Sequence, residues 1–148
     1  MGNYYLAVDI GASSGRHILG HVENGKITYE EVYRFENNLE RRDGHLCWNI
    51  DRLFNEIVNG IAKCKEIGKL PISMGIDTWG VDFGLLDEHG ALLESAVHYR
   101  DDRTLGMQEE VFKAIPKERV YELTGLQFEN FNTIFQLYSL VKKRPWLL

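Results

Sequence analysis

The sequence predicts an α/β protein built on a mixed sheet, with an antiparallel three-stranded start and flanking helices. Two observations predict this class. The chain opens with segments of strand length joined by a hairpin signal, and a segment with helical periodicity separates them from the next apolar run. A doubly wound dinucleotide fold needs a helix directly after its first glycine-rich loop, and a strand-like segment occupies that place here.

Three strands are expected at the N-terminus. Residues 4–10 (YYLAVDI) form an apolar run closed by Asp9, which is typical of a strand buried on both faces. Residues 16–23 follow as a second strand, and residues 27–35, with alternating apolar and polar side chains, as a third. Between them, Asn24-Gly25 is the strongest short hairpin signal in the sequence.

A helix and a further strand come next. Residues 37–45 are polar and predict a loop, and residues 46–48 predict a short extended piece. Asn49 or Asp51 then caps a helix in which apolar residues recur every four positions. Gly68 ends this helix and Pro71 prevents its continuation, so that residues 72–78 form the next strand.

The C-terminal half is expected to contain two more strands and then helices. Residues 81–87 and 91–99 are predicted as strands joined by a turn at His89-Gly90. Helices are expected over 103–115, from Pro116 to Gly125, and from about 132 to 143, where Pro145 stops the last one.

Composition limits the classes of function. The 148 residues are 44% hydrophobic and 26% charged with a formal net charge of −5, which is ordinary for one soluble globular domain. No cluster of Lys and Arg indicates nucleic-acid binding. The N-terminus shows no basic segment and no long apolar run, so we expect no signal peptide, no membrane anchor and a cytoplasmic location. The two cysteines and five histidines show no zinc-ligand spacing.

The first candidate site joins the first two strands, over Asp9-Ile10-Gly11-Ala12-Ser13-Ser14-Gly15-Arg16. Small residues let the backbone approach a ligand, and successive amide groups in a tight turn bind anions. The serine hydroxyls and the Arg16 guanidinium add donors, while Asp9 suits a hydrated Mg²⁺. We predict a phosphate site without a Walker lysine. The alternative is an ordinary small-residue hairpin turn.

The second candidate site is a junction between two predicted strands. Trp79 offers a flat apolar wall to the C–H face of a sugar, and Gly80 permits close approach. Asp77 and Asp82 can accept hydrogen bonds from hydroxyl groups. The alternative for Trp79 is a place in the core, since large aromatic residues are usually highly buried. Tyr99–Thr104 and Phe131–Thr133 are likewise candidates either for ligand contacts or for helix caps.

Together these motifs resemble the N-terminal part of the FGGY carbohydrate kinases, and among them the branch that acts on L-rhamnulose. The resemblance covers essentially the whole chain. The first motif is widespread among actin-like ATPases, whereas the string Asp-Thr-Trp-Gly-Val-Asp at 77–82 is much narrower. The segments that carry it are residues 8–16, 48–51, 75–83, 99–104, 124–128 and 131–133.

The resemblance implies a ribonuclease-H-like fold of the actin-like ATPase type, duplicated in the complete enzyme. It further implies transfer of the ATP γ-phosphoryl group to the primary hydroxyl of L-rhamnulose, with Mg²⁺. It assigns ATP-phosphate contacts to Ala12, Ser13, Ser14, Gly15 and Arg16. It assigns a substrate contact to Gly80, and sugar-pocket positions to Thr78, Trp79, Asp82, Tyr99, Phe131 and Asn132. Another ketose or polyol as substrate, or a non-catalytic nucleotide- or sugar-binding module, are the alternatives.

The resemblance also implies what this sequence lacks. Members of the family are much longer, and their catalytic Asp and adenine-binding domain lie beyond residue 148. We therefore expect residues 1–148 to be an incomplete N-terminal sugar-kinase domain with no catalytic residue of its own. We expect it to be inactive alone, because phosphoryl transfer needs groups from both sides of the cleft.

Overall fold

The computed structural model describes residues 3–148, so the first two residues of the expected domain and of its N-terminal segment lie outside the described residues. The chain divides into two compact units. Unit 1 comprises Met1–Leu39 and Asn49–Gly80, and unit 2 comprises Glu40–Trp48 and Val81–Leu148. Each unit has its own core.

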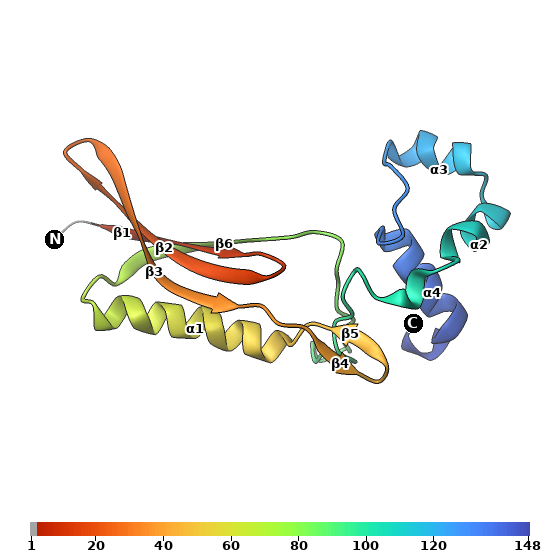
Figure 1. The fold of residues 1–148 in the computed structure, drawn as a ribbon, viewed down its shortest axis with the longest axis horizontal. Coiled ribbons are helices and arrows are strands. Elements are labelled where there is room, and N and C mark those ends of the chain that lie inside the picture. Colours follow the sequence, from red (N-terminus) through yellow and green to blue (C-terminus); the bar gives the residue numbers. More distant parts are fainter. Residues whose placement is uncertain (1–2) are drawn as a thin grey trace. The chain divides into compact units, whose positions relative to one another are not determined.

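Unit 1 is a four-stranded mixed sheet with the strand order β3-β2-β1-β6 (Figure 1). Its strands are β1 (Tyr4–Ile10), β2 (Ser14–Glu23), β3 (Lys26–Glu36) and β6 (Pro71–Thr78). The first three pair antiparallel, and β6 pairs parallel with β1. The antiparallel three-stranded start and the mixed sheet predicted from the sequence are confirmed.

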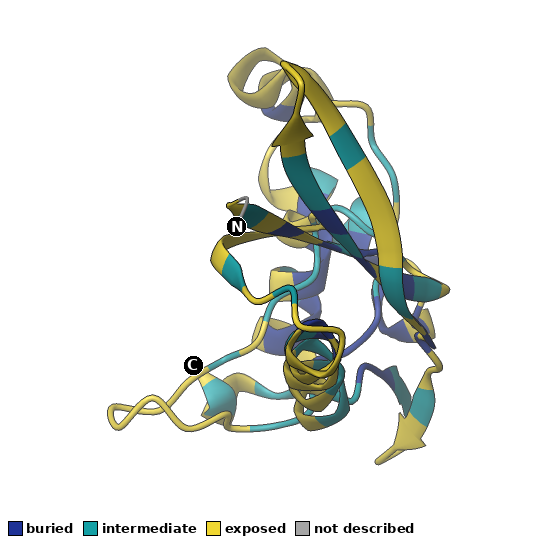
Figure 2. Ribbon diagram, turned by 90° about the vertical axis from the view of Figure 1, so that its left-hand side faces the viewer, coloured by how far each residue is buried: buried dark blue, intermediate teal, exposed yellow. Residues whose placement is uncertain are grey.

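The β2–β3 hairpin forms at the predicted Asn24-Gly25 turn. Asn24 has φ +51° and Gly25 has φ +75°, the pair of positive angles that a two-residue type I′ hairpin turn requires. β2 begins at Ser14, two residues before the predicted start at Arg16. β3 is exposed along most of its length (Figure 2).

Helix α1 (Ile50–Glu66) covers one face of this sheet (Figure 1). The helix places Leu53, Ile57 and Ile61 against the core of the unit, as their four-residue spacing predicts. The Asn49 side chain accepts a hydrogen bond from the Arg52 amide, which identifies Asn49 as the cap. The buried residues of this core are Leu6, Val8, Ile10, Leu19, Phe35 and Cys64.

A buried histidine lies between the sheet and α1. His17 is 0% exposed, and its Nε2–H donates to the carbonyl oxygen of Ile57 over 3.2 Å. Its Nδ1 has no hydrogen-bond partner among the described residues. Burial lowers the pKa of His17, so the ring is neutral near pH 7. A Cβ atom on Gly60 of α1 would lie 2.2 Å from the His17 ring, which explains a glycine within the helix.

We predict that Gly60→Ala destabilises the protein. The added methyl group collides with His17 and should lower the free energy of unfolding by about 1–3 kcal/mol, although alanine is the better helix former. Gly75→Ala in β6 is the control, because a Cβ there meets nothing within 4 Å. Urea denaturation of both variants measures the difference, and equal stabilities would contradict this explanation of the glycine.

Unit 2 begins with a short hairpin that the sequence analysis missed. The stretch predicted as a loop over 37–45 contains β4 (Glu40–Arg42), whereas the short extended piece predicted over 46–48 is confirmed as most of β5 (His45–Cys47), which pairs antiparallel with β4. Asp43 and Gly44, with φ +50° and +84°, make the two-residue turn between them. The segment was predicted as a loop because it is polar, and its backbone pairing needs no apolar alternation.

The two strands predicted over 81–87 and 91–99 do not form. Only isolated bridges join Leu86 to Leu92 and Cys47 to Val97. The Asp87 side chain accepts hydrogen bonds from the His89 and Ala91 amides and closes a local turn. Leu86 and Leu92 are exposed, so a longer ladder between these two segments would gain no burial of their side chains.

The rest of unit 2 is helical, as predicted, with one interruption. The 3₁₀ turn η1 (Asp102–Thr104) precedes α2 (Met107–Ala114), and Gly106, at φ +76°, breaks the single helix expected over 103–115. Helix α3 (Lys117–Thr124) runs between Pro116 and Gly125. Helix α4 (Thr133–Lys143) is followed by the 3₁₀ turn η2 (Pro145–Leu147). Met107, Val111 and Phe135 form the core.

None of the helices over residues 3–148 is both long and apolar enough to cross a membrane.

Candidate functional site

The predicted phosphate loop is the turn between β1 and β2. The Gly11 amide donates to the Ser14 carbonyl over 2.9 Å and closes the turn. Ala12 and Ser13 are exposed at its tip. Within residues 3–148 the amides of Ala12 and Ser13 donate to no acceptor. Two adjacent exposed amides form the kind of concavity that binds an anion.

Asn37, directly after β3, holds the β1–β2 turn through two hydrogen bonds. It is 5% exposed. Its amide donates to the Ser13 carbonyl over 2.9 Å, and its Nδ2 donates to the Gly11 carbonyl over 3.0 Å. Because Asn37 satisfies carbonyl groups of the turn, the amides at the tip remain available to a ligand. The sequence analysis placed Asn37 in a loop, and no local pattern marks it as a partner 24 residues away from Ser13.

The glycine at position 15 has a packing role. A Cβ atom on Gly15 would lie 2.1 Å from the ring of Phe35, its partner in the β2–β3 ladder. Gly15 is buried, and the position that a side chain would occupy there faces the core of unit 1. Its backbone still belongs to the turn, and a contact with phosphate there stays a prediction.

Asp9 and Arg16 form an ion pair across β1 and β2. Arg16 Nε donates to Asp9 Oδ2 over 2.8 Å, and both side chains are about half exposed, at 46% and 42%. The register of the parallel pair places Asp77 of β6 beside Asp9. Two carboxylates at the C-terminal ends of neighbouring parallel strands suit Mg²⁺, which prefers oxygen ligands and keeps several waters.

The predicted sugar contacts of unit 1 lie at the end of β6 and directly after it. Thr78 is its exposed last residue. Trp79 is half-buried and packs against the core of the unit, which matches the alternative for this residue. Gly80 is exposed, and a Cβ there would meet nothing within 4 Å. No neighbour among residues 3–148 therefore explains a glycine at this position.

In unit 2, Tyr99 and Phe131 belong to a cluster of aromatic rings in contact with one another. Their centroids are 5.8 Å apart in an edge-to-face arrangement. His98 stacks on Tyr99 at 4.2 Å, and the buried Trp48 contacts His98 at 4.6 Å. Trp48 and His98 did not emerge as ligand candidates from the sequence, because nothing local distinguishes them from core residues.

Asp82 joins this cluster through the indole of Trp48. Trp48 Nε1 donates to Asp82 Oδ2 over 2.6 Å. The Arg100 amide donates to His98 Nδ1 over 2.9 Å, so the proton of the neutral ring is on Nε2. Burial lowers the pKa of His98, which keeps the ring neutral beside the carboxylate. The cluster therefore combines flat apolar faces with one carboxylate, a composition that suits a polyhydroxylated ligand.

Two caps hold the segments that carry these rings. Asp101 accepts hydrogen bonds from the Leu46 and Arg103 amides and from His45. Burial alone would raise the pKa of Asp101, but these donors lower it, so Asp101 is a structural anion directly after the Tyr99 segment. Asn132 is the N-cap residue of α4, and its Oδ1 accepts from the Glu129 amide over 2.8 Å. A sugar contact of Asn132 stays a prediction.

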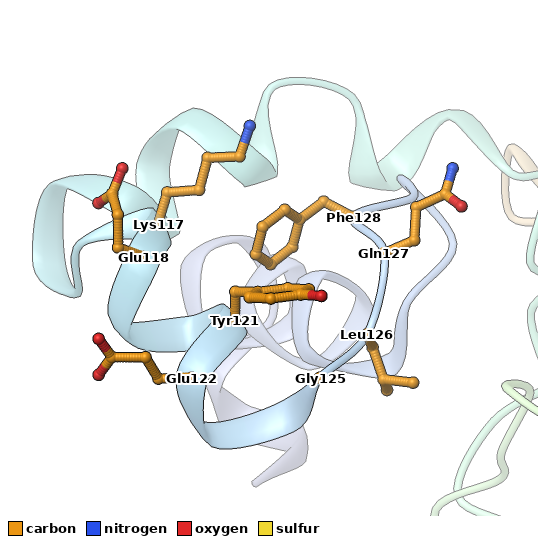
Figure 3. A pocket seen from close by; sticks show the side chains of 8 residues that line it. All are labelled: Lys117, Glu118, Tyr121, Glu122, Gly125, Leu126, Gln127 and Phe128. Atoms are coloured by element: carbon orange, nitrogen blue, oxygen red, sulfur yellow. The ribbon is translucent and has the colours of Figure 1, made fainter.

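A separate pocket lies elsewhere in unit 2. It has a volume of about 930 Å³ and lies beside α3. Figure 3 shows the rings of Tyr121 and Phe128 on its wall, with Lys117 above them. No site residue predicted from the sequence lines it, although residues 125–128, from one of the segments that carry the family resemblance, do. Its wall carries two glutamates and a single lysine, so the charge of the wall does not favour phosphate.

The chain matches a known family along nearly its whole length. The FGGY family of carbohydrate kinases, N-terminal domain, matches residues 4–147. The chain is 57% identical to a rhamnulokinase of Halalkalibacterium halodurans over 143 residues, covering 97% of this chain and 30% of that protein. It is 45% identical to the rhamnulokinase of Bacillus subtilis over 135 residues, covering 91% and 28%. The chain thus spans about 30% of the length of these curated relatives.

Solved sugar kinases share its fold. A gluconate kinase from Lactobacillus acidophilus superimposes with a TM-score of 0.82 at 15% identity, over 99% of this chain and 30% of that one. A xylulose kinase from the same organism gives 0.81 at 15% identity, over 98% and 29%. These similarities confirm the expected ribonuclease-H-like fold of the actin-like ATPase type.

We predict that Asn37→Ala loosens the β1–β2 turn. Loss of the bond to the Gly11 carbonyl should cost about 1–2 kcal/mol of unfolding free energy and speed amide exchange in the turn. Asn38→Ala is the matched control, because Asn38 is exposed and bonds only the exposed Glu36 carboxylate. Urea denaturation and hydrogen exchange measure both effects. Identical behaviour of the two variants would show that Asn37 does not anchor the turn.

Proposed function

Because the chain belongs to the FGGY family of carbohydrate kinases, we propose that it forms the phosphate-binding turn and part of the sugar pocket of an ATP-dependent L-rhamnulose kinase. The observation that carries this proposal is the identity of up to 57% with proteins named rhamnulokinase. In the reaction, the primary hydroxyl oxygen of the ketose attacks the γ-phosphorus of ATP. The bond to the bridging oxygen breaks, ADP leaves, the hydroxyl proton passes to a base, and L-rhamnulose 1-phosphate forms.

The β1–β2 turn is proposed to bind the ATP phosphates. The amides of Ala12 and Ser13 and the hydroxyls of Ser13 and Ser14 are donors at an exposed turn. Arg16 adds a positive charge that Asp9 holds in place. Mg²⁺, near Asp9 and Asp77, would neutralise charge on the transferred group. Such donors assist phosphoryl transfer chiefly by positioning and charge stabilisation.

Sugar contacts are proposed in each unit by itself: at Thr78, Trp79 and Gly80 in unit 1, and at the aromatic cluster in unit 2. Tyr99 and Phe131 offer apolar ring surface, Asp82 accepts from hydroxyl groups, and Asn132 lies at the start of α4. Aromatic faces with a few polar groups recognise sugars by orienting their hydroxyls.

No residue of this chain is proposed as the catalytic base. We propose that the base and the adenine site belong to the part of the relatives that this chain does not cover, and that residues 1–148 alone do not turn over substrate. A cytoplasmic location is part of the proposal, and the two buried free cysteines, Cys47 and Cys64, suit a reducing compartment.

A kinase assay with a panel of ketoses and polyols, on the full-length protein that contains this chain, tests the substrate. We expect ATP consumption that depends on L-rhamnulose. Turnover with a different ketose alone would overturn the substrate and keep the reaction class. Binding of nucleotide or sugar without any turnover would instead favour the non-catalytic module.

The phosphate assignment predicts a selective effect of removing both hydroxyls. In the full-length enzyme, Ser13→Ala with Ser14→Ala should raise KM for ATP about tenfold, because lost hydrogen bonds to a charged group cost about 1.5 kcal/mol or more. KM for the sugar should change by less than about twofold. Ser73→Ala on exposed β6 is the control. An equal rise in both KM values would make the turn merely structural.

A further inference from the structure

Val81 adopts a backbone conformation that is costly for its residue type. Its φ is +70°, in the left-handed region that a β-branched residue rarely enters. Such a conformation persists only where the surrounding structure holds it. Val81 immediately precedes Asp82, whose carboxylate accepts from the Trp48 indole. The strained residue therefore sets the direction of the carboxylate in the proposed sugar pocket.

Two side chains of α4 hold the strained residue through its carbonyl oxygen. Thr133 Oγ1 donates to the Val81 carbonyl over 3.1 Å, and Gln136 Nε2 donates to the same oxygen over 3.1 Å. The two donors lie one turn apart on the same helix. A carbonyl that accepts two hydrogen bonds resists the rotation that would relieve its own backbone.

Gln136 uses its whole amide group in this way. It is 0% exposed. Besides Val81, its Nε2 donates to the Phe131 carbonyl over 2.8 Å, and its Oε1 accepts from Arg103 Nη2 over 2.5 Å. A glutamate could not donate to two carbonyls and a lysine could not accept from arginine, so only an amide completes this set.

The buried guanidinium of Arg103 needs a hydrogen-bond acceptor, and the side-chain amide oxygen of Gln136 is one. Its side chain is buried, with 7% of the residue exposed, and no carboxylate among residues 3–148 lies within ion-pair distance of it. The guanidinium lies over the ring of Phe83 at 5.7 Å, and burial lowers its pKa. The carboxylates of Asp101, Asp82 and Glu94 act on this charge from beyond ion-pair distance, and a buried charge also needs hydrogen-bond acceptors, of which Gln136 Oε1 is one.

We propose that Gln136 is the positioning residue of the sugar pocket. Through Val81 it orients Asp82, and through Phe131 it places the ring that contacts Tyr99, although it touches no substrate itself. This inference rests on the proposed function of the pocket. It adds a determinant of sugar affinity that lies on α4, behind the residues that would contact the ligand.

Gln136→Met in the full-length protein tests the inference, because methionine keeps the size and removes every hydrogen bond. We expect KM for the sugar to rise about tenfold or more, since small misplacements of positioning groups are costly. KM for ATP should stay within about twofold. Thr133→Val removes one of the two bonds to Val81 from an exposed position. This variant should raise KM for the sugar by a smaller factor. It tests the positioning role if Gln136→Met does not fold.

Gln127→Met is the matched control, because Gln127 is an exposed glutamine that bonds only the Glu129 carboxylate. Its KM values should equal those of the wild type. Equal rises of the sugar and ATP KM values in Gln136→Met, or unchanged KM values in both Gln136→Met and Thr133→Val, would overturn the positioning role.

Hydrogen exchange separates this inference from the proposed function. Without any ligand, exchange over residues 81–83 and 131–135 should be about tenfold faster in Gln136→Met than in Gln127→Met, because the freed carbonyls release their segments. Unchanged exchange would overturn the inference whatever the substrate. Absence of sugar-dependent turnover in the wild type would refute only the proposed function.

Discussion

Burial of β1 at the centre of the sheet is the constraint on which unit 1 depends. Leu6, Val8 and Ile10 face the core, while the backbone of β1 pairs with β2 on one side and β6 on the other. Parallel pairing with β6 brings Asp9 and Asp77 to the same edge, and antiparallel pairing with β2 sets Arg16 opposite Asp9. The positions of Asp9, Asp77 and Arg16 near the turn therefore follow from the pairing of an apolar strand with its two neighbours.

Several residues that resemble ligand contacts also serve packing. Gly15 lies under the ring of Phe35, and Gly60 admits the ring of His17. Trp79 packs against the core of unit 1. A small residue or an aromatic residue in a motif thus has two explanations, and only the neighbours in space show which one applies.

In unit 2, buried polar side chains hold the backbone in place, whereas in unit 1 the hydrogen bonds between strands do so. Its loops lack the long strands that the sequence predicted, so their backbone groups need other partners. Asp101 binds the Leu46 and Arg103 amides, and Gln136 binds the carbonyls of Val81 and Phe131. Fully satisfied polar groups of this kind give a loop one conformation, which a binding site on loops requires.

The sequence alone determined the three-stranded start, the Asn24-Gly25 turn and helix α1, because these features arise from periodicity and local turn chemistry. It also narrowed the cap of α1 to Asn49 or Asp51. It also located the β1–β2 turn, which is the candidate phosphate site, and the Asp-Thr-Trp-Gly-Val-Asp string. Only the tertiary structure decided that residues 81–99 form loops, and that Asn37, Trp48, His98 and Gln136 support the candidate sites. These residues act through hydrogen bonds and ring contacts with segments distant in the chain. Such partners leave no trace in local spacing, since they depend on how the elements pack.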